Sequence, residues 1–412
     1  MPMTEILTAE SLLGLRLGAL GLAGSAAATE REAQDRAEQD RAGSEQDPSG
    51  ADRIAATARR MLAVQGQDWR SARWALGMRT PGTTVAHVHE AFDRGLVVRS
   101  WPMRGTIHVV AAEDIGWLQE ATNHRVLAGA PKRRAFLGMS DAALDRLVET
   151  SLAALAGGAA LDRDELSAAW TEAGIEWQSS WRYHVIWWIC QNGLAVFGPT
   201  SAGGEPLLVR ADEWIRAPRA RTGDDALAEL ATRYTAARGP VSAKDLAWWS
   251  GLTLRETRQA LALAAEAGGI VAARLGDASG PELWLAPEQL AAAPSLDAES
   301  WLLLPAFDEH LLGYTERAAQ LAPEHFERVV PGRNGMFLGT VAAAGRTRGT
   351  WRRSTRARGG VEVSPFPGET IDAASLAPRV AEWCAFHGVP ELPLEFPTPA
   401  GEPAPGGRGV RV

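Results

Sequence analysis

The chain has 412 residues, of which 46% are hydrophobic and 22% charged, and its formal net charge is -8 at pH 7. This length predicts two or three domains, and the composition is that of an ordinary soluble protein. The longest largely apolar stretch, residues 12–28, is interrupted by Arg16 and has no basic leader, so we expect neither a signal peptide nor a membrane span. Cys190 and Cys384 lack metal-binding spacing, which suits a reducing, cytoplasmic location without disulfides.

The charge is unevenly distributed along the chain. Residues 1–50 contain nine Asp or Glu and four Arg, whereas residues 331–360 contain seven Arg and no Asp or Glu. The net charge argues against nonspecific affinity for nucleic acid, but a polyanion would meet the local basic patch rather than the average.

The N-terminal region predicts one helix and one insertion. Residues 4–22 place Leu13, Leu17 and Leu20 on a common helical face. Residues 26–50 have almost no large apolar side chains, so they cannot bury enough surface to offset the entropy of ordering. We expect a mobile insertion there.

The most unusual stretch is residues 61–79, MLAVQGQDWRSARWALGMR. Gln65 and Gln67 flank Gly66 between two segments of helical spacing. Side chains two residues apart point the same way only where the backbone is extended or turning, and glycine makes such a break easy. The stretch is a candidate site; the alternative is a loop between helices whose amides are merely solvated.

A pattern of helical segments followed by two short strands occurs three times. The strand pairs are predicted at 95–98 with 106–110, at 193–197 with 206–209, and at 269–273 with 282–285. In the third copy Ser242 caps a short helix, Gly251 supplies a turn, and Thr253 with Glu256 forms a capping box. Three helices and a two-stranded wing are the winged-helix plan, although any single copy could be an ordinary helical hairpin. The predicted fold class is mainly α with β wings.

The C-terminal region is predicted to be β-rich. A strand at 301–305 is followed by a hairpin in which 335–343 returns as 347–353 through a turn at Ala344 and Gly345, and by a helix at 371–386. The predicted organisation is a first winged helix at 1–125 with the amide motif and the insertion, a second at 126–220, a third at 221–292, a β-rich region with a basic hairpin at 293–388, and a Pro/Gly tail at 389–412.

Motifs of several enzyme classes are missing from the sequence. There is no GxxxxGK[ST] loop, no GxGxxG after a strand and no GxSxG elbow. His87 and His89 face different ways on a predicted helix, and the other histidines are isolated. We therefore expect no metal site and no cofactor.

Five segments together resemble a known family. They are VQGQD at 64–68, RSWPMRGTIHVV at 99–110, GPVSAKDLAWWSGL at 239–252, LLPAFDEHLLGYTER at 303–317 and NGMFLGTVAAAGRTRGTWRR at 334–353. The set resembles the winged-helix DNA-binding proteins that include the AlkZ-type DNA glycosylases, and the likeness runs from about residue 7 to 386 apart from the insertion. Those enzymes remove alkylated purines and unhook interstrand crosslinks, as in self-protection against azinomycin-like antibiotics, although many family members have no assigned activity.

The resemblance implies a C-shaped arrangement of three tandem winged helices whose concave basic surface takes duplex DNA. It also implies a catalytic Gln-aliphatic-Gln motif, which falls on Gln65 and Gln67; the second Gln, where one branch has Asp, favours the crosslink-unhooking branch. Gly66 departs from the pattern because an aliphatic side chain is usual there, and this puts the anchoring of the loop in question. The family also requires a β-hairpin, for which 337–353 is the candidate.

Neutral amides suit the removal of an N7-alkylated purine, which is already cationic and needs no strong general acid. On this hypothesis Gln67 positions a water near C1′ and Gln65 supports the sugar or the lesion. Asp68 is a less favoured alternative base. Arg104 and His108, on the first predicted wing, are candidate contacts to phosphate or to the active site.

The basic hairpin and the residues after it supply further candidate DNA contacts, which would neutralise phosphates. They are Arg346, Arg348, Arg352, Arg353, Arg356 and Arg358. The predicted function is that of a monomeric, monofunctional DNA repair glycosylase acting on double-stranded DNA with alkylated purines, without metal, cofactor or membrane. The alternatives are a winged-helix DNA-binding or regulatory protein in which Gln65 and Gln67 are structural, and a protein-interaction scaffold.

Overall fold

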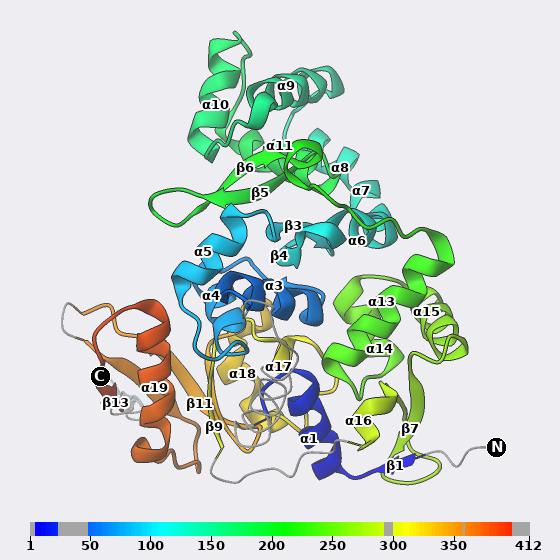
Figure 1. Cartoon of the computed structure of the whole chain (residues 1–412), viewed down its shortest axis with the longest axis vertical. Coiled ribbons are helices and arrows are strands. Elements are labelled where there is room, and N and C mark those ends of the chain that lie inside the picture. The colour runs from blue at the N-terminus through cyan, green and yellow to red at the C-terminus, as the bar shows by residue number, and fades with distance from the viewer. Residues whose placement is uncertain (1–4, 24–47, 292–299, 357–358, 398–412) are drawn as a thin grey trace, which may run out of the picture.

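The computed structural model describes residues 5–23, 48–291, 300–356 and 359–397 (Figure 1). Helices predominate in these residues and the strands form three sheets, so the prediction of a mainly α protein with smaller β parts is confirmed. Residues 26–47 of the expected insertion lie outside the described residues. Its last residue, Gly50, begins a helix that Ser49 caps.

The first group of elements contains the amide stretch. It consists of α3 (Gly50–Met61), β2 (Val64–Gln65), α4 (Trp69–Gly77), α5 (Val85–Asp93), β3 (Val97–Met103) and β4 (Thr106–Ala111). Helix α3 buries Ile54, Ala58 and Met61 completely, at the spacing of a single helical face. This face fixes the helix that leads into the amides.

A helical linker joins the first group to a second group. The linker is η1 (Ala112–Asp114), α6 (Ile115–Thr122), α7 (His124–Ala128) and α8 (Ala130–Phe136). The second group is α9 (Asp141–Ala154), η2 (Ala156–Gly158), α10 (Arg163–Glu172), α11 (Ser179–Gln191), β5 (Ala195–Thr200), β6 (Pro206–Arg210) and α12 (Ala211–Trp214).

The third group confirms the helix ends predicted from its sequence. Ser242 caps α14, Gly251 ends it in the left-handed conformation with φ at 80°, and Thr253 and Glu256 form the capping box of α15. The elements are α13 (Gly223–Arg238), α14 (Ala243–Ser250), α15 (Leu254–Glu266), β7 (Val271–Leu275), β8 (Glu282–Leu285) and α16 (Pro287–Ala291).

All three groups have an antiparallel pairing between the segment that joins two helices and a strand. In each, a residue between the first and second helices lies opposite a residue on the second strand of the pair. The pairs are Gln65 with His108, Leu161 with Leu208, and Val241 with Trp284. The strand pairs of the first two groups also join into one sheet, in the order β2-β4-β3-β5-β6.

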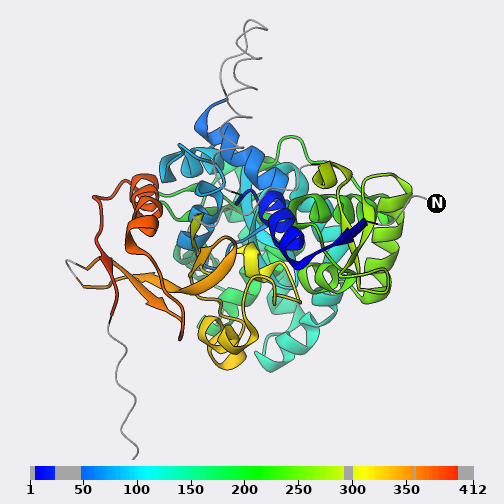
Figure 2. The same ribbon diagram turned by 90° about the horizontal axis from the view of Figure 1, so that it is seen from below.

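The prediction of one helix over residues 4–22 is wrong at its start. Residues Glu5–Leu7 form strand β1, which pairs in parallel with β7, and Figure 2 shows this blue strand running to the green third group. Helix α1 covers only Ala9–Ala19, because Thr8 and Ser11 form a capping box that opens it there. The backbone before Thr8 is therefore extended and free to pair with the sheet.

The C-terminal region forms a five-stranded sheet in the order β13-β12-β11-β10-β9, with helix α19 beside it (Figure 1). The predicted hairpin is confirmed as β10 and β11, and part of the predicted tail forms β13. The elements are β9 (Trp301–Leu304), α17 (Glu309–Leu312), η3 (Pro323–His325), α18 (Phe326–Val329), η4 (Pro331–Arg333), β10 (Thr340–Ala343), β11 (Arg346–Arg353), β12 (Val361–Pro365), α19 (Ala373–His387) and β13 (Leu394–Glu395).

Candidate functional site

The structure joins the two glutamines of the amide motif. Gln65 ends β2 and is buried, with 6% of its surface exposed, whereas Gln67 is exposed in the loop before α4. The Gln65 Nε2 group donates a hydrogen bond to Gln67 Oε1 over 3.0 Å. The backbone between them is thus extended enough to bring both amides to one side.

The Gln65 side chain retains an unused acceptor. Its Oε1 atom is buried and accepts no hydrogen bond from any described residue. A buried acceptor without a partner costs about 1–3 kcal/mol, so core packing alone would not favour this residue. The atom therefore remains available as a hydrogen-bond acceptor next to Gln67.

Gly66 brings the loop into direct contact with β4. Its N–H donates to the Ile107 carbonyl oxygen over 2.8 Å. A Cβ atom on Gly66 would lie only 3.1 Å from the carbonyl carbon of His108 and 3.2 Å from its Cα. Glycine in place of the usual aliphatic residue therefore lets the loop lie closer to β4, and this contact anchors the loop.

Arg99, on β3, holds the same loop by its carbonyl groups. Its Nε donates to the Gly66 oxygen over 2.8 Å, and its Nη2 lies 3.5 Å from the Gln67 oxygen. Burial lowers the pKa of Arg99 to about 10, which still leaves it charged at neutral pH. Sequence reasoning missed this residue, and the available signal was a single arginine within a buried apolar strand.

A buried ion pair fixes the backbone just before the amides. The chain turns at Leu62, which has a positive φ of 63°. On either side of it, the Met61 and Ala63 carbonyl oxygens accept hydrogen bonds from Arg238 over 3.0 and 2.9 Å. Arg238 is held in turn by Glu309, whose Oε2 lies 2.8 Å from its Nε. The third group and the C-terminal region thus set the position of β2, a contribution that sequence reasoning also missed.

His108 lies directly opposite Gln65, so the two side chains share one face of the sheet. Its Nδ1 donates to the Thr106 oxygen over 3.0 Å, which leaves Nε2 as an acceptor 3.5 Å from Nη2 of Arg104. Burial, and then the positive charge of Arg104, lower the pKa of His108 to about 3. The imidazole beside the amides is therefore neutral at physiological pH.

Arg104 occupies the turn between β3 and β4 with a positive φ of 54°. Its Nη1 lies 3.5 Å from the Trp248 carbonyl oxygen, so it bridges the first and third groups. Burial lowers the pKa of Arg104. The structure brings Arg104 and His108 to the amide motif; their contact with DNA remains a prediction.

Asp68 is already engaged in the local backbone. Its Oδ1 accepts the Ser71 N–H over 2.9 Å and so caps α4. This geometry accounts for the carboxylate without any role as a base.

The basic hairpin belongs to a different sheet from the amide motif, and the structure does not bring the two together. Arg348 pairs with Glu369 and Arg352 with Glu362, each over 2.7 Å. Arg346 and Arg353 are exposed and form no ion pair with any described residue.

The turn of the hairpin is covered rather than free. The Gly345 oxygen accepts a hydrogen bond from Nε2 of His310 over 2.8 Å. A Cβ atom on Gly345 would lie 2.7 Å from Cδ1 of Leu17 on α1. The tip of the predicted DNA-binding hairpin therefore packs against the N-terminal helix.

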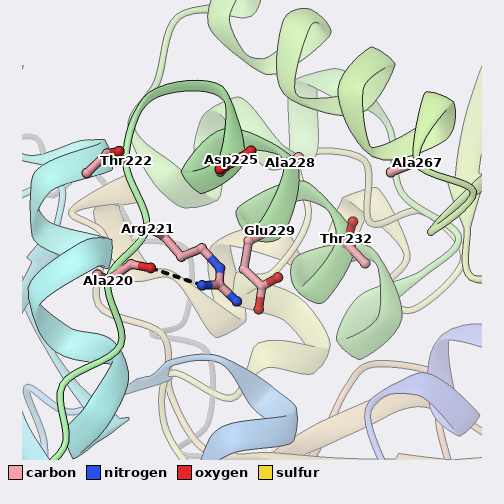
Figure 3. A pocket seen from close by; sticks show the side chains of 8 residues that line it. All are labelled: Ala220, Arg221, Thr222, Asp225, Ala228, Glu229, Thr232 and Ala267. Carbon is pink, nitrogen blue, oxygen red and sulfur yellow. Dashed lines mark hydrogen bonds between the residues drawn. The ribbon is translucent and has the colours of Figure 1, made fainter.

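A polar hollow lies between the segment that follows α12 and helix α13, and it shares no lining residue with the amide motif. Figure 3 shows Arg221 and Glu229 pointing toward one another in it.

In the described parts of the chain, no group of three or more His, Cys, Asp or Glu side chains is arranged to hold a metal ion. Nor does any helix in those parts have the length and apolar character needed to cross a bilayer.

Comparisons with known proteins agree on one family. The model of the family described as DNA glycosylase AlkZ-like matches residues 58–386. A relative from Streptomyces sahachiroi, named interstrand DNA cross-link repair glycosylase, is 24% identical over 354 residues, which cover 82% of this chain and 91% of the relative. The solved structure of Streptomyces sahachiroi DNA glycosylase AlkZ has a similar fold, with a TM-score of 0.71 and 20% identity over 95% of this chain and 99% of that one.

Proposed function

The chain belongs to the family of AlkZ-like DNA glycosylases, and from this premise we propose that it hydrolyses the N-glycosidic bond of N7-alkylated purines in duplex DNA. The observation that carries the proposal is the hydrogen-bonded pair of neutral amides, Gln65 and Gln67, at the edge of a buried strand.

The chemistry needs positioning more than acid catalysis. An N7-alkylated purine carries a positive charge, so when the C1′–N9 bond breaks the electron pair leaves with the base, which departs neutral. Positive charge then develops on the sugar, and a water adds to C1′ and loses a proton to solvent. An enzyme assists by orienting that water and by placing partial negative charge near the sugar.

The two amides divide these tasks. Gln67 is exposed, and its Oε1, already polarised by the Gln65 N–H, accepts a hydrogen bond from the attacking water. The buried Oε1 of Gln65 lies beside it as a second acceptor for the sugar or the lesion. Neutral amides provide this negative potential without the desolvation that a buried carboxylate would require.

The three groups of helices and strands act in this proposal as tandem winged helices around a C-shaped, concave DNA surface. In this arrangement Arg104 contacts the phosphate backbone of the DNA beside the lesion. Helices α7 and α8 of the linker add positive charge that the sequence analysis did not single out. They carry Arg125, Lys132, Arg133 and Arg134, with no Asp or Glu between residues 121 and 140, although Arg134 pairs with Asp141.

Hydrolysis without a covalent intermediate fits the amine content of the chain. A glycosylase that also cleaves the strand uses an amine to form a Schiff base with the sugar. This chain has two lysines, Lys132 on α8 and Lys244 on α14, and neither is bonded to the amides. We expect a monofunctional enzyme, and reduction with borohydride during turnover should trap no protein–DNA adduct.

Interstrand crosslinks are the finer substrate in this proposal. The relative named as a cross-link repair glycosylase supports it, as does the neutral amide of Gln67 at the second motif position. Because Gln67 is exposed, a crosslinked purine could be reached without being flipped into a deep pocket. The two thiols, Cys190 and Cys384, are free and buried, which accords with a monomer working in the reducing cytoplasm.

The test is base release from duplexes that contain one N7-methylguanine or one N7-linked crosslink, with abasic sites scored by alkaline cleavage. We expect release by the protein, and a loss of about 100-fold or more in Gln65→Ala and Gln67→Ala with duplex affinity retained. Tight duplex binding without release above the spontaneous rate would instead favour a winged-helix regulator.

A further inference from the structure

Trp248 stands out among the tryptophans of the chain. All sixteen lie in the described residues, and only Trp248 belongs to the exposed class, with 44% of its surface accessible. Its neighbour Trp249 is completely buried and donates to Glu309. The second helix of the third group thus places one indole in the core and the next at the surface, where it is open to a ligand.

The exposed indole is held in place. Its Nε1 donates to the Leu312 oxygen over 3.1 Å. The guanidinium of Arg317 lies 5.7 Å from the ring centroid and is itself fixed by a 2.6 Å hydrogen bond to the Leu311 oxygen. A ring fixed before binding loses little entropy when a partner stacks on it.

The backbone of Trp248 is linked to the amide site. Arg104 contacts the Trp248 oxygen with Nη1 and His108 with Nη2, each over 3.5 Å. His108 is directly opposite Gln65. A single arginine therefore links His108, the cross-strand neighbour of Gln65, to the backbone of α14.

The surroundings of the ring suit nucleic acid. Arg317 lies at the ring, Arg104 contacts the backbone oxygen of the same residue, and the exposed Lys244 lies one turn earlier on the same face of α14. A planar aromatic ring on a segment with three cations matches a ligand that carries both aromatic rings and phosphates. A lipid tail or an apolar peptide would gain nothing from these charges.

We propose that Trp248 is a stacking platform beside the amide site, which binds a planar aromatic ring of the damaged duplex as the lesion is presented to Gln65 and Gln67. The ring comes either from a base next to the lesion or from an aromatic substituent on the alkylated purine. This inference rests on the proposed function, because it assumes that the damaged base approaches the amide pair.

The experiment compares Trp248→Leu, which keeps apolar bulk without an aromatic face, with Trp248→Phe, which keeps the face. Dissociation constants are measured in a Gln67→Ala background, so that binding is read without base release. The duplexes contain guanine, N7-methylguanine, N7-benzylguanine or N7-cyclohexylmethylguanine at one position. Thermal unfolding of each variant separates local effects from loss of the fold.

We expect Trp248→Leu to weaken binding of a damaged duplex about tenfold and Trp248→Phe to restore most of it. A loss on every damaged duplex identifies a neighbouring base as the ring, whereas a loss on the benzyl lesion alone identifies the substituent. Equal losses on damaged and undamaged duplexes, or none at all, would overturn the platform. Phe396→Leu, at an exposed ring beside β13, should change nothing.

The proposed function is tested separately from the stacking platform. Base release by the protein with an intact motif tests the glycosylase, whereas the affinities in the Gln67→Ala background test the platform. Release from N7-methylguanine with unchanged affinities in Trp248→Leu would leave the enzyme and remove the platform.

Discussion

In both the first and the third group, the segment between two helices pairs antiparallel with the second strand, but the paired side chains differ. In the third group Val241 and Trp284 exchange two backbone hydrogen bonds of 2.9 and 2.8 Å, and Val241 is completely buried. In the first group the corresponding segment pairs Gln65 with His108, also buried but polar. These two residues form a non-hydrogen-bonded pair, because the next backbone bond runs from the Gly66 N–H to the Ile107 oxygen, and such a pair brings its two side chains close together.

This difference indicates how a reactive site can be built on a structural repeat. The pairing fixes position, and the rest of the molecule offsets the unfavourable burial of polar groups. Arg99 satisfies the loop carbonyls and Arg238 the turn before β2. The second group, with Leu161 opposite Leu208, resembles the third.

The largest expected effect comes from erasing the difference. Gln65→Val gives the first group an apolar side chain like that of Val241 in the third group. We expect base release to fall about 100-fold or more, since one of two positioned acceptors is lost. The melting temperature should stay the same or rise, because a buried acceptor without a partner is removed. Single-turnover release and thermal unfolding measure the two effects.

The reverse substitution is the matched control. Val241→Gln places an amide in the third group, where no described arginine supports a following loop. It should destabilise the fold by about 1–3 kcal/mol and leave release per folded molecule unchanged. A melting temperature that falls in Gln65→Val and not in Val241→Gln would contradict the comparison.

A smaller effect is expected when the support of the loop is removed. Arg99→Met keeps the length of the side chain but releases the Gly66 and Gln67 carbonyl groups. Release at saturating DNA should fall about tenfold, because small displacements of positioned groups reduce rates by this order, while DNA affinity stays within about twofold. Arg379→Met, on the surface pair with Glu382 in α19, is the control and should have neither effect.

The sequence predicted those parts of the site that local pattern determines. The capping signals of Ser242, Thr253 and Glu256 depend on neighbours within three residues, so the third group was predicted closely. Two amides around a glycine indicated a break in the helical pattern at Gln65 and Gln67, and left open whether the backbone there is extended or turning. By contrast, Arg99 contacts Gly66, which is 33 positions away in the sequence, and Arg238 contacts Ala63, which is 175 positions away. No local sequence pattern reports such contacts.

The basic hairpin illustrates the same limit from the other side. Seven arginines without an acid in residues 331–360 suggested a free cationic surface. In the fold, Glu362 and Glu369 from outside that window pair with Arg352 and Arg348, and α1 covers the turn. Charge counted along a segment does not include partners that the fold supplies.

Gly66→Ala sharpens the comparison with a modest effect. The new Cβ would lie 3.1 Å from the His108 backbone, which two neighbouring strands hold in place. The loop must therefore move by a few tenths of an ångström, and we expect release to fall about threefold, with stability changed by less than about 1 kcal/mol. Faster base release by this variant would contradict the expectation, because it would mean that the close contact with β4 places the amides unfavourably.

The smallest expected effect is that of pH on the rate. Amides do not titrate, and His108 stays neutral far below pH 6 because burial lowers its pKa to about 3. Single-turnover release from the bound complex should therefore change by less than about twofold between pH 6 and 9; a sigmoidal fall toward pH 6 would indicate that an ionisable base is at work.

The stability of the fold should depend on pH, unlike the rate. As pH falls from about 6.5 toward 3, the unfolded chain binds a proton at this histidine that the folded protein does not, so stability is lost by up to about 1.4 kcal/mol per pH unit. His108→Asn should remove that part of the loss, and unfolding in denaturant at pH 7 and pH 5 measures it. The polar pair of the first group therefore lowers stability in acid, which the apolar pair of the third group does not do. The rate of base release is nevertheless expected to be insensitive to pH, because neutral amides do not titrate.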